Sequence, residues 1–157
     1  MALKPDRYEP FIDVLYFMNE TGAAGLVVVH DTTTPASGAA LDDAGMLVKL
    51  PDVLLASGEY PVGMLMGDVV NLDLTRTHLN AHKRESQVGG KVGVARNGSF
   101  VTNQISGSPS AGQDAYFTIG GFLTGNTSAP TSGSKKVGVW RSSKDSDGYA
   151  RVDINIV

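Results

Sequence analysis

The chain has 157 residues, of which 41% are hydrophobic and 18% charged, with 19 glycines and no cysteine. Its length fits one domain with a core of its own, and the lack of cysteine excludes disulfides, thiolate catalysis and cysteine-based zinc sites. The formal net charge of −3 provides no bulk basicity, so we expect no nucleic-acid partner. Few charges with many turn-forming residues favour an all-β chain.

The N-terminal region, residues 1–31, predicts two strands, at 11–18 and 25–30, joined by a glycine-containing turn. Two interpretations stay open: a core hairpin, or an arm that docks on another subunit or partner. Its apolar density would be a liability if exposed. We therefore expect interface contacts from Phe11, Tyr16, Phe17 and Met18.

The start of the chain lacks the basic and apolar regions of a signal peptide, and its apolar stretches are too short to span a bilayer. We expect a protein made in the cytoplasm, with no membrane partner. An irregular connecting segment follows at residues 32–59. It begins with a small, polar loop and continues with a short strand after the turn at Asp42 and Asp43. Pro51 and Gly58 then bracket a possible short helix.

Residues 60–157 read as a β-domain with frequent turns. Strands are expected at residues 62–74, 91–96, 99–102, 115–119, 122–124, 137–142 and 149–156, with hairpin signals at Asn97-Gly98 and Gly120-Gly121. This pattern predicts a single antiparallel β-sandwich or β-barrel with at most one or two short helices.

The last strand carries the clearest pattern. Apolar and polar residues alternate along it, with the apolar positions at Ala150, Val152, Ile154 and Ile156. This alternation predicts a strand with one face buried and the other exposed to solvent. Residues 137–140 are its expected partner, across a turn closed by Asp147-Gly148.

Trp140 falls on the opposite face of its strand from Val137 and Val139. That face is expected to be an interface or a second core layer. Together with Tyr116 and Tyr149, Trp140 could also form an aromatic platform for a carbohydrate.

Metal motifs are incomplete. His78 and His82 are four residues apart, but Leu79 stands where a zinc protease carries its glutamate, and His30 is the only other histidine. The Asp145–Gly148 stretch resembles part of a calcium loop, yet Ile154 stands where the bidentate glutamate is needed. We expect a polar connector and a hairpin turn, with no metal and no cofactor.

Catalytic motifs fail in the same way. Gly89-Gly90-Lys91 lacks the remaining residues of a phosphate loop, and His30-Asp31 has no serine elbow to complete a triad. The carboxylates of Asp42 and Asp43 are adjacent and splay apart. A basic cluster at Arg76 and residues 82–84 is most simply a solvated face, although an acidic protein partner is plausible. The chain is not expected to be an enzyme.

Several stretches resemble a known group of proteins. Residues 87–105, 112–117 and 120–124, with the closing hairpin at 137–140 and 149–155, are similar to small virion structural proteins of tailed bacteriophages. The resemblance covers residues 60–157 and consists of turn-and-strand patterns. It implies a capsid decoration (cement) protein that binds the outer surface of the head, has the major capsid protein as its partner and forms a homo-oligomer, with a trimer favoured. Two alternatives stay open: a vertex or tail-associated β-module, and a carbohydrate- or ligand-binding β-sandwich.

Overall fold

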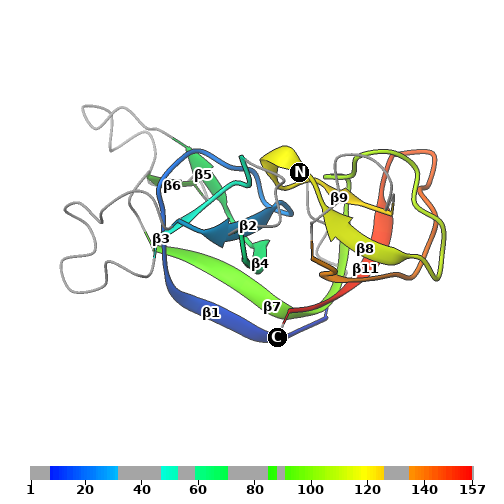
Figure 1. Ribbon diagram of the computed structural model, residues 1–157, viewed down its shortest axis with the longest axis horizontal. Coiled ribbons are helices and arrows are strands. Elements are labelled where there is room, and N and C mark those ends of the chain that lie inside the picture. The colour runs from blue at the N-terminus through cyan, green and yellow to red at the C-terminus, as the bar shows by residue number, and fades with distance from the viewer. Residues whose placement is uncertain are drawn as a thin grey trace.

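The computed structural model describes residues 8–31, 47–52, 59–70, 85–87, 91–125 and 135–156. The predicted all-β class is confirmed (Figure 1). The strands are β1 (Tyr8–Met18), β2 (Val27–His30), β3 (Leu47–Lys49), β4 (Pro61–Leu65), β5 (Asp68–Val70), β6 (Glu85–Gln87), β7 (Lys91–Thr102), β8 (Asp114–Phe117), β9 (Leu123–Thr124), β10 (Gly138–Trp140) and β11 (Ala150–Asn155). One 3₁₀ turn, η3 (Ile119–Gly121), joins β8 to β9. Within the described ranges, no helix is long and apolar enough to cross a membrane.

Five strands close into a barrel. They follow the order β1-β3-β2-β4-β7, and β1 also pairs with β7, which completes the ring. Most pairings are antiparallel, but β1–β3 and the separate β5–β6 pair are parallel. Closure leaves these strands without a free edge, which removes the main route to edge-to-edge aggregation.

A second curved sheet continues from the same long strand. Its order is β7-β11-β10-β8-β9, and a bridge between Ile105 and Leu123 brings the chain after β7 back to β9. Figure 1 shows β7 running beside β1 below the barrel and on towards β11. The two halves of the molecule therefore share one strand.

Two apolar clusters correspond to these halves. The barrel interior receives side chains from all five barrel strands, namely Tyr16, Met18, Val28, Val48, Val62, Leu65, Val92 and Val94. The second cluster joins the outer face of the barrel, through Val27, Val29 and Met64, to the sheet that carries Phe100 and Trp140. Val27, Val28 and Val29 are all fully buried because β2 is covered on both faces, which is why no alternation marks it.

The hairpin predicted at Asn97-Gly98 is wrong, because β7 runs straight through it. Asn97 pairs with Phe11 on one side and with Asn155 on the other, so both neighbours hold the backbone extended. A two-residue hairpin of the Asn-Gly type needs positive φ at both residues, and only Gly98 has it.

The N-terminal segment is part of the barrel. β3 lies between β1 and β2, so the predicted pairing of 11–18 with 25–30 as a hairpin is wrong. β1 instead pairs along β7 from Tyr8↔Ser99 to Phe17↔Lys91. A detached arm is therefore not what residues 8–18 form.

Smaller corrections concern strand limits. The expected strand at 62–74 ends at Leu65 and resumes at Asp68, beyond Gly67, and residues 71–74 lie outside the described chain. The predicted alternation is confirmed for residues 150–155, whereas Ile156 lies beyond the strand and is half-buried. The β10–β11 connection is wider than a two-residue turn, because Arg141 and Ser142 both donate to the carbonyl of Arg151. The predicted helix at 51–58 falls mostly outside the described residues.

Candidate functional site

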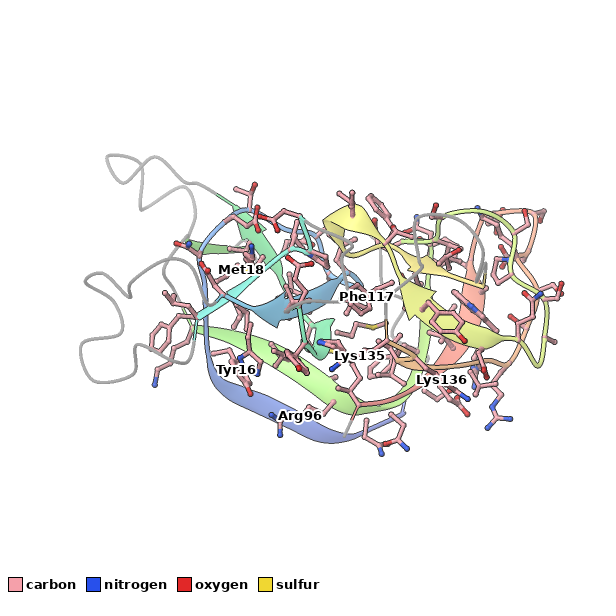
Figure 2. All side chains as sticks on the ribbon, viewed as in Figure 1. Tyr16, Met18, Arg96, Phe117, Lys135 and Lys136 are labelled. Atoms are coloured by element: carbon pink, nitrogen blue, oxygen red, sulfur yellow. The ribbon has the colours of Figure 1, made fainter. Side chains whose placement is uncertain are left out.

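The predicted interface residues face the chain's own core. Tyr16, Phe17, Met18 and Trp140 are all buried, and Trp140 is fully enclosed. Figure 2 places Tyr16 and Met18 among the barrel strands. No more than 8% of any of these four residues is exposed, so they offer little surface to a partner, because they are already buried within the chain. The Phe11 side chain lies outside the described set, and its interface role stays a prediction.

The proposed aromatic platform does not form as expected. Trp140 is enclosed in the same apolar cluster as Val137, rather than in a layer on the opposite face from it, while Tyr116 and Tyr149 are only half-buried. A sugar platform needs its largest ring exposed, so Trp140 cannot serve as one.

The sequence motifs divide into two groups. Asp145 makes a turn, as expected: its Oδ1 accepts hydrogen bonds from the backbone N–H of Asp147 (3.1 Å) and Tyr149 (2.7 Å). Other candidates lie outside the described chain, namely Asp42, Asp43, Arg76, His78, His82, Lys83, Arg84, Gly89 and Gly90. Among the residues that are described, no group of three or more His, Asp or Glu side chains could hold a metal ion.

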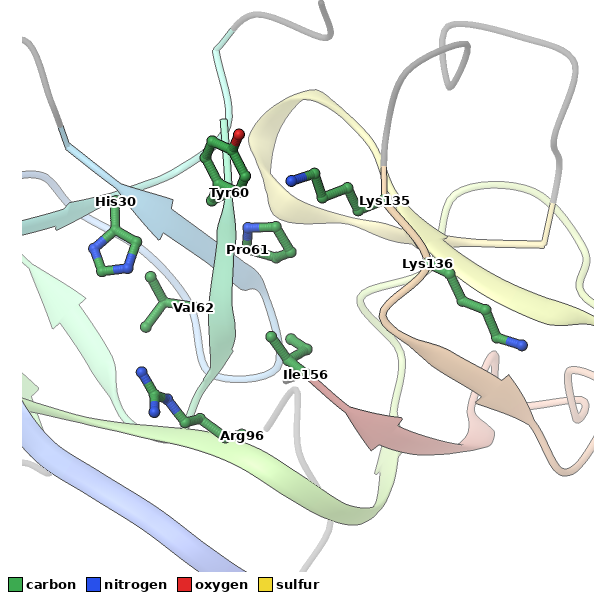
Figure 3. Close-up of a pocket in the computed structure, with 8 residues that line it drawn as sticks. All are labelled: His30, Tyr60, Pro61, Val62, Arg96, Lys135, Lys136 and Ile156. Atoms are coloured by element: carbon green, nitrogen blue, oxygen red, sulfur yellow. The ribbon is translucent and has the colours of Figure 1, made fainter. Parts of the chain in front are cut away.

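A cleft opens where the mouth of the barrel meets the end of β11. Its volume is about 360 Å³, within the range of small ligand sites. The lining residues lie on or directly beside β2, β4, β7 and β11 and on the segment before β10, namely His30, Tyr60, Pro61, Val62, Arg96, Lys135, Lys136 and Ile156 (Figure 3). Among the described residues, the lining therefore combines three permanent cations and a histidine with an apolar floor and contains no carboxylate.

Arg96 is the central cation of this cleft. Its Nη2 donates to the Tyr16 hydroxyl oxygen at 2.8 Å, and its guanidinium lies 6.0 Å from the centre of that ring. The half-buried guanidinium is thus held in place by a neutral group. No ion pair joins Arg96 to a carboxylate within the described part of the chain.

His30 lies beside Arg96 and packs edge-on against Tyr16, with ring centres 5.9 Å apart. Burial, followed by the positive charge of Arg96, holds the pKa of His30 below its ordinary value of 6.5. The imidazole is therefore predominantly neutral at pH 7 and adds hydrogen-bonding capacity without charge.

The two lysines of the cleft differ in what they face. Lys135 Nζ sits 3.3 Å from the centre of the Tyr60 ring, a cation–π contact at an exposed site. Lys136 pairs with Asp114 at 2.7 Å, and in Figure 3 its ammonium points away from Arg96 and Lys135. Of the three cations, Arg96 and Lys135 therefore have no carboxylate partner among the described residues.

An exposed apolar turn forms a second surface feature. Ile119 (54% exposed) and Phe122 (40%) flank two glycines with φ of 78° and 80°. The backbone is tied down, since Gly120 N–H donates to the Pro51 carbonyl and Thr118 N–H to that of Phe122, each at 2.8 Å. This apolar turn, residues 119–122, therefore holds two large side chains in water on a fixed backbone.

Sequence reasoning missed both features. Arg96 and Lys135 carry no local motif, and the cleft residues stem from segments more than one hundred positions apart. The apolar turn did carry a signal, two glycines between large apolar residues, which predicted a turn but not its exposure.

No family model matches this chain, and no curated protein matches it.

Proposed function

We propose that the chain is a non-enzymatic virion structural protein of the capsid-decoration class. In this proposal it binds the outer surface of a phage head, contacts the major capsid protein and acts as a homo-oligomer, with a trimer favoured. The sequence resemblance over residues 60–157 supports the class. A protein that binds the assembled shell but not its separate subunits stabilises the shell by mass action.

The observation that carries the proposal is the apolar turn. Large apolar side chains in water mark contact surfaces when they are clustered and held rigidly. Ile119 and Phe122 meet both conditions. Tyr60 is a further large hydrophobic side chain in water (57% exposed). Its neighbour Glu59 accepts a hydrogen bond from the Asp52 N–H, and Asp52 follows Pro51, whose carbonyl anchors Gly120. Such a surface suits a flat protein partner better than a small molecule.

A closed barrel that shares a strand with a second sheet also suits the mechanical role. Strands β1 and β7 pair along most of their lengths, and β7 couples both cores. Repeated weak contacts from a rigid oligomer add through avidity, so each single contact need not be strong.

The test is co-sedimentation with capsid shells of the virus that encodes the chain, together with the solution mass from light scattering. We expect a discrete oligomer that sediments with shells in many copies. The double substitution Ile119→Ser with Phe122→Ser should weaken shell binding by about tenfold or more, since two exposed apolar anchors are lost. Lys144→Gln, an exposed change on the β10–β11 connection, is the matched control and should bind normally.

Two outcomes would replace the proposal. A handful of copies per particle would indicate a vertex or tail-associated module. A monomer that ignores shells would move the function to a ligand-binding β-module.

A further inference from the structure

We propose that the cleft between the barrel mouth and the end of β11 binds a carboxylate side chain presented by an acidic polypeptide segment. The inference is independent of shell binding, because it concerns the chemistry of the cleft and holds for whichever protein carries the segment. It starts from the described residues of the lining, which include three permanent cations and no carboxylate.

Arg96 provides the first step of the argument. Removing a guanidinium from water is costly unless an anion compensates it, and the described chain offers Arg96 only the neutral Tyr16 hydroxyl. That contact uses Nη2 and fixes the orientation of the side chain. The remaining N–H donors of the planar fork match the two oxygens of a carboxylate. Arg96 is therefore positioned to receive an anion.

Lys135 and His30 provide the second step. The Lys135 ammonium lies against the Tyr60 ring, at the rim of the cleft, where it is positioned to attract a negative charge. His30 adds a hydrogen-bonding group next to Arg96. Lys136 contributes little, because Asp114 already neutralises it. The net effect is a local positive field on a chain whose overall charge is −3.

The apolar part of the lining indicates what carries the carboxylate. Pro61, Val62 and Ile156 form an apolar floor, and the exposed Tyr60 ring extends it at the rim. A free inorganic anion gains nothing from such a floor, whereas a peptide places apolar atoms next to its acidic side chain. A nucleic-acid strand needs a row of cations along its backbone, whereas the described part of the cleft offers two that no carboxylate pairs with, Arg96 and Lys135.

The experiment measures fluorescence anisotropy with a labelled acidic hexapeptide of aspartate, glutamate and leucine, blocked at both ends. Its counterpart replaces every acid by the matching amide. At physiological ionic strength we expect the acidic peptide to bind and the amide peptide to bind at least about tenfold more weakly. Inorganic phosphate and a single-stranded DNA oligonucleotide serve as competitors and should displace the peptide poorly.

Three variants locate the site. Arg96→Gln should lower the affinity about tenfold, and Lys135→Gln severalfold, because each loses a charge that faces the ligand. Lys136→Gln is the matched control: it removes a neighbouring lysine of the same type and should change the affinity less than twofold. Lys135 is exposed, so its substitution tests the cleft even if Arg96→Gln weakens folding.

Several results would overturn the inference. Unchanged binding in both Arg96→Gln and Lys135→Gln would place the peptide elsewhere. Equal binding of the amide peptide would remove the role of the carboxylate. Displacement by phosphate or DNA at concentrations comparable to the peptide would assign the cleft to those anions instead.

Discussion

Replacing Gly63 by alanine tests how closely β4 and β7 pack in the wall of the barrel. A Cβ built at Gly63 lies 2.5 Å from the carbonyl oxygen of Ala95 and 2.6 Å from Cγ1 of Val94. The Val94 methyl can move, but the carbonyl belongs to a strand held on both sides. The backbones of the two strands must therefore separate.

The expected cost follows from these contacts. Overpacking of this kind lowers the free energy of unfolding by up to about 3 kcal/mol. Replacing glycine by alanine also reduces the conformational entropy of the unfolded chain, which raises the free energy of unfolding by up to about 1 kcal/mol. The net loss is about 2 kcal/mol, which corresponds to a fall in Tm of about 4–8 °C for a domain of this size.

The matched control is Gly67→Ala. Among the described residues, no atom beyond the two chain neighbours lies within 4 Å of a Cβ at Gly67, and its φ is not positive. This variant should be neutral or more stable by up to about 1 kcal/mol, because only the unfolded chain is affected.

The assay is urea unfolding followed by the fluorescence of Trp140, the only tryptophan of the chain, which is fully buried in the second sheet. Because β7 contributes to both apolar clusters, a substitution that destabilises the barrel should lower the urea midpoint reported by Trp140 fluorescence. A Gly63→Ala protein within about 0.5 kcal/mol of the parent chain would refute the packing argument.

Two further predictions concern His30 and Asp145. The pKa of His30 is lowered on folding, so the unfolded chain takes up its proton first; stability should be full above pH 6.5 and fall as the pH drops towards the lowered pKa. Urea midpoints between pH 5 and 8 should show this slope, and His30→Gln should flatten it; an equal slope in both proteins would contradict the assignment. Asp145→Ala should cost about 1 kcal/mol, since it removes two hydrogen bonds to backbone N–H groups. Asp147→Ala, whose side chain makes no such bond in the described contacts, should leave the unfolding midpoint unchanged, and equal losses in both variants would count against the turn.

Local sequence patterns predicted strands and turns well where one face of the element is exposed to solvent. The alternation at Ala150, Val152 and Ile154 is present in β11, and Gly120-Gly121 forms the expected turn between β8 and β9. Both signals act over a few residues, through strand periodicity and through the backbone freedom of glycine. The all-β class follows from the same kind of information.

Which strands pair with one another, and which side chains are exposed, depended on the tertiary structure. Asn97-Gly98 is a good local turn signal, yet two neighbouring strands keep it extended inside β7. The apolar run at residues 16–18 predicted an interface because the sequence shows the run itself. It does not show the strands that cover these residues, since those strands are distant in the sequence.

The cleft depended on the fold most of all. His30, Tyr60, Arg96 and Lys135 are separated along the chain and share no motif; they meet only because barrel closure brings β2, β4 and β7 to one end beside β11. The sequence alone determined which segments are strands and turns, since these depend on neighbouring residues. Which charges share a cleft was decided by long-range strand pairing, because no local window contains the pairing partner.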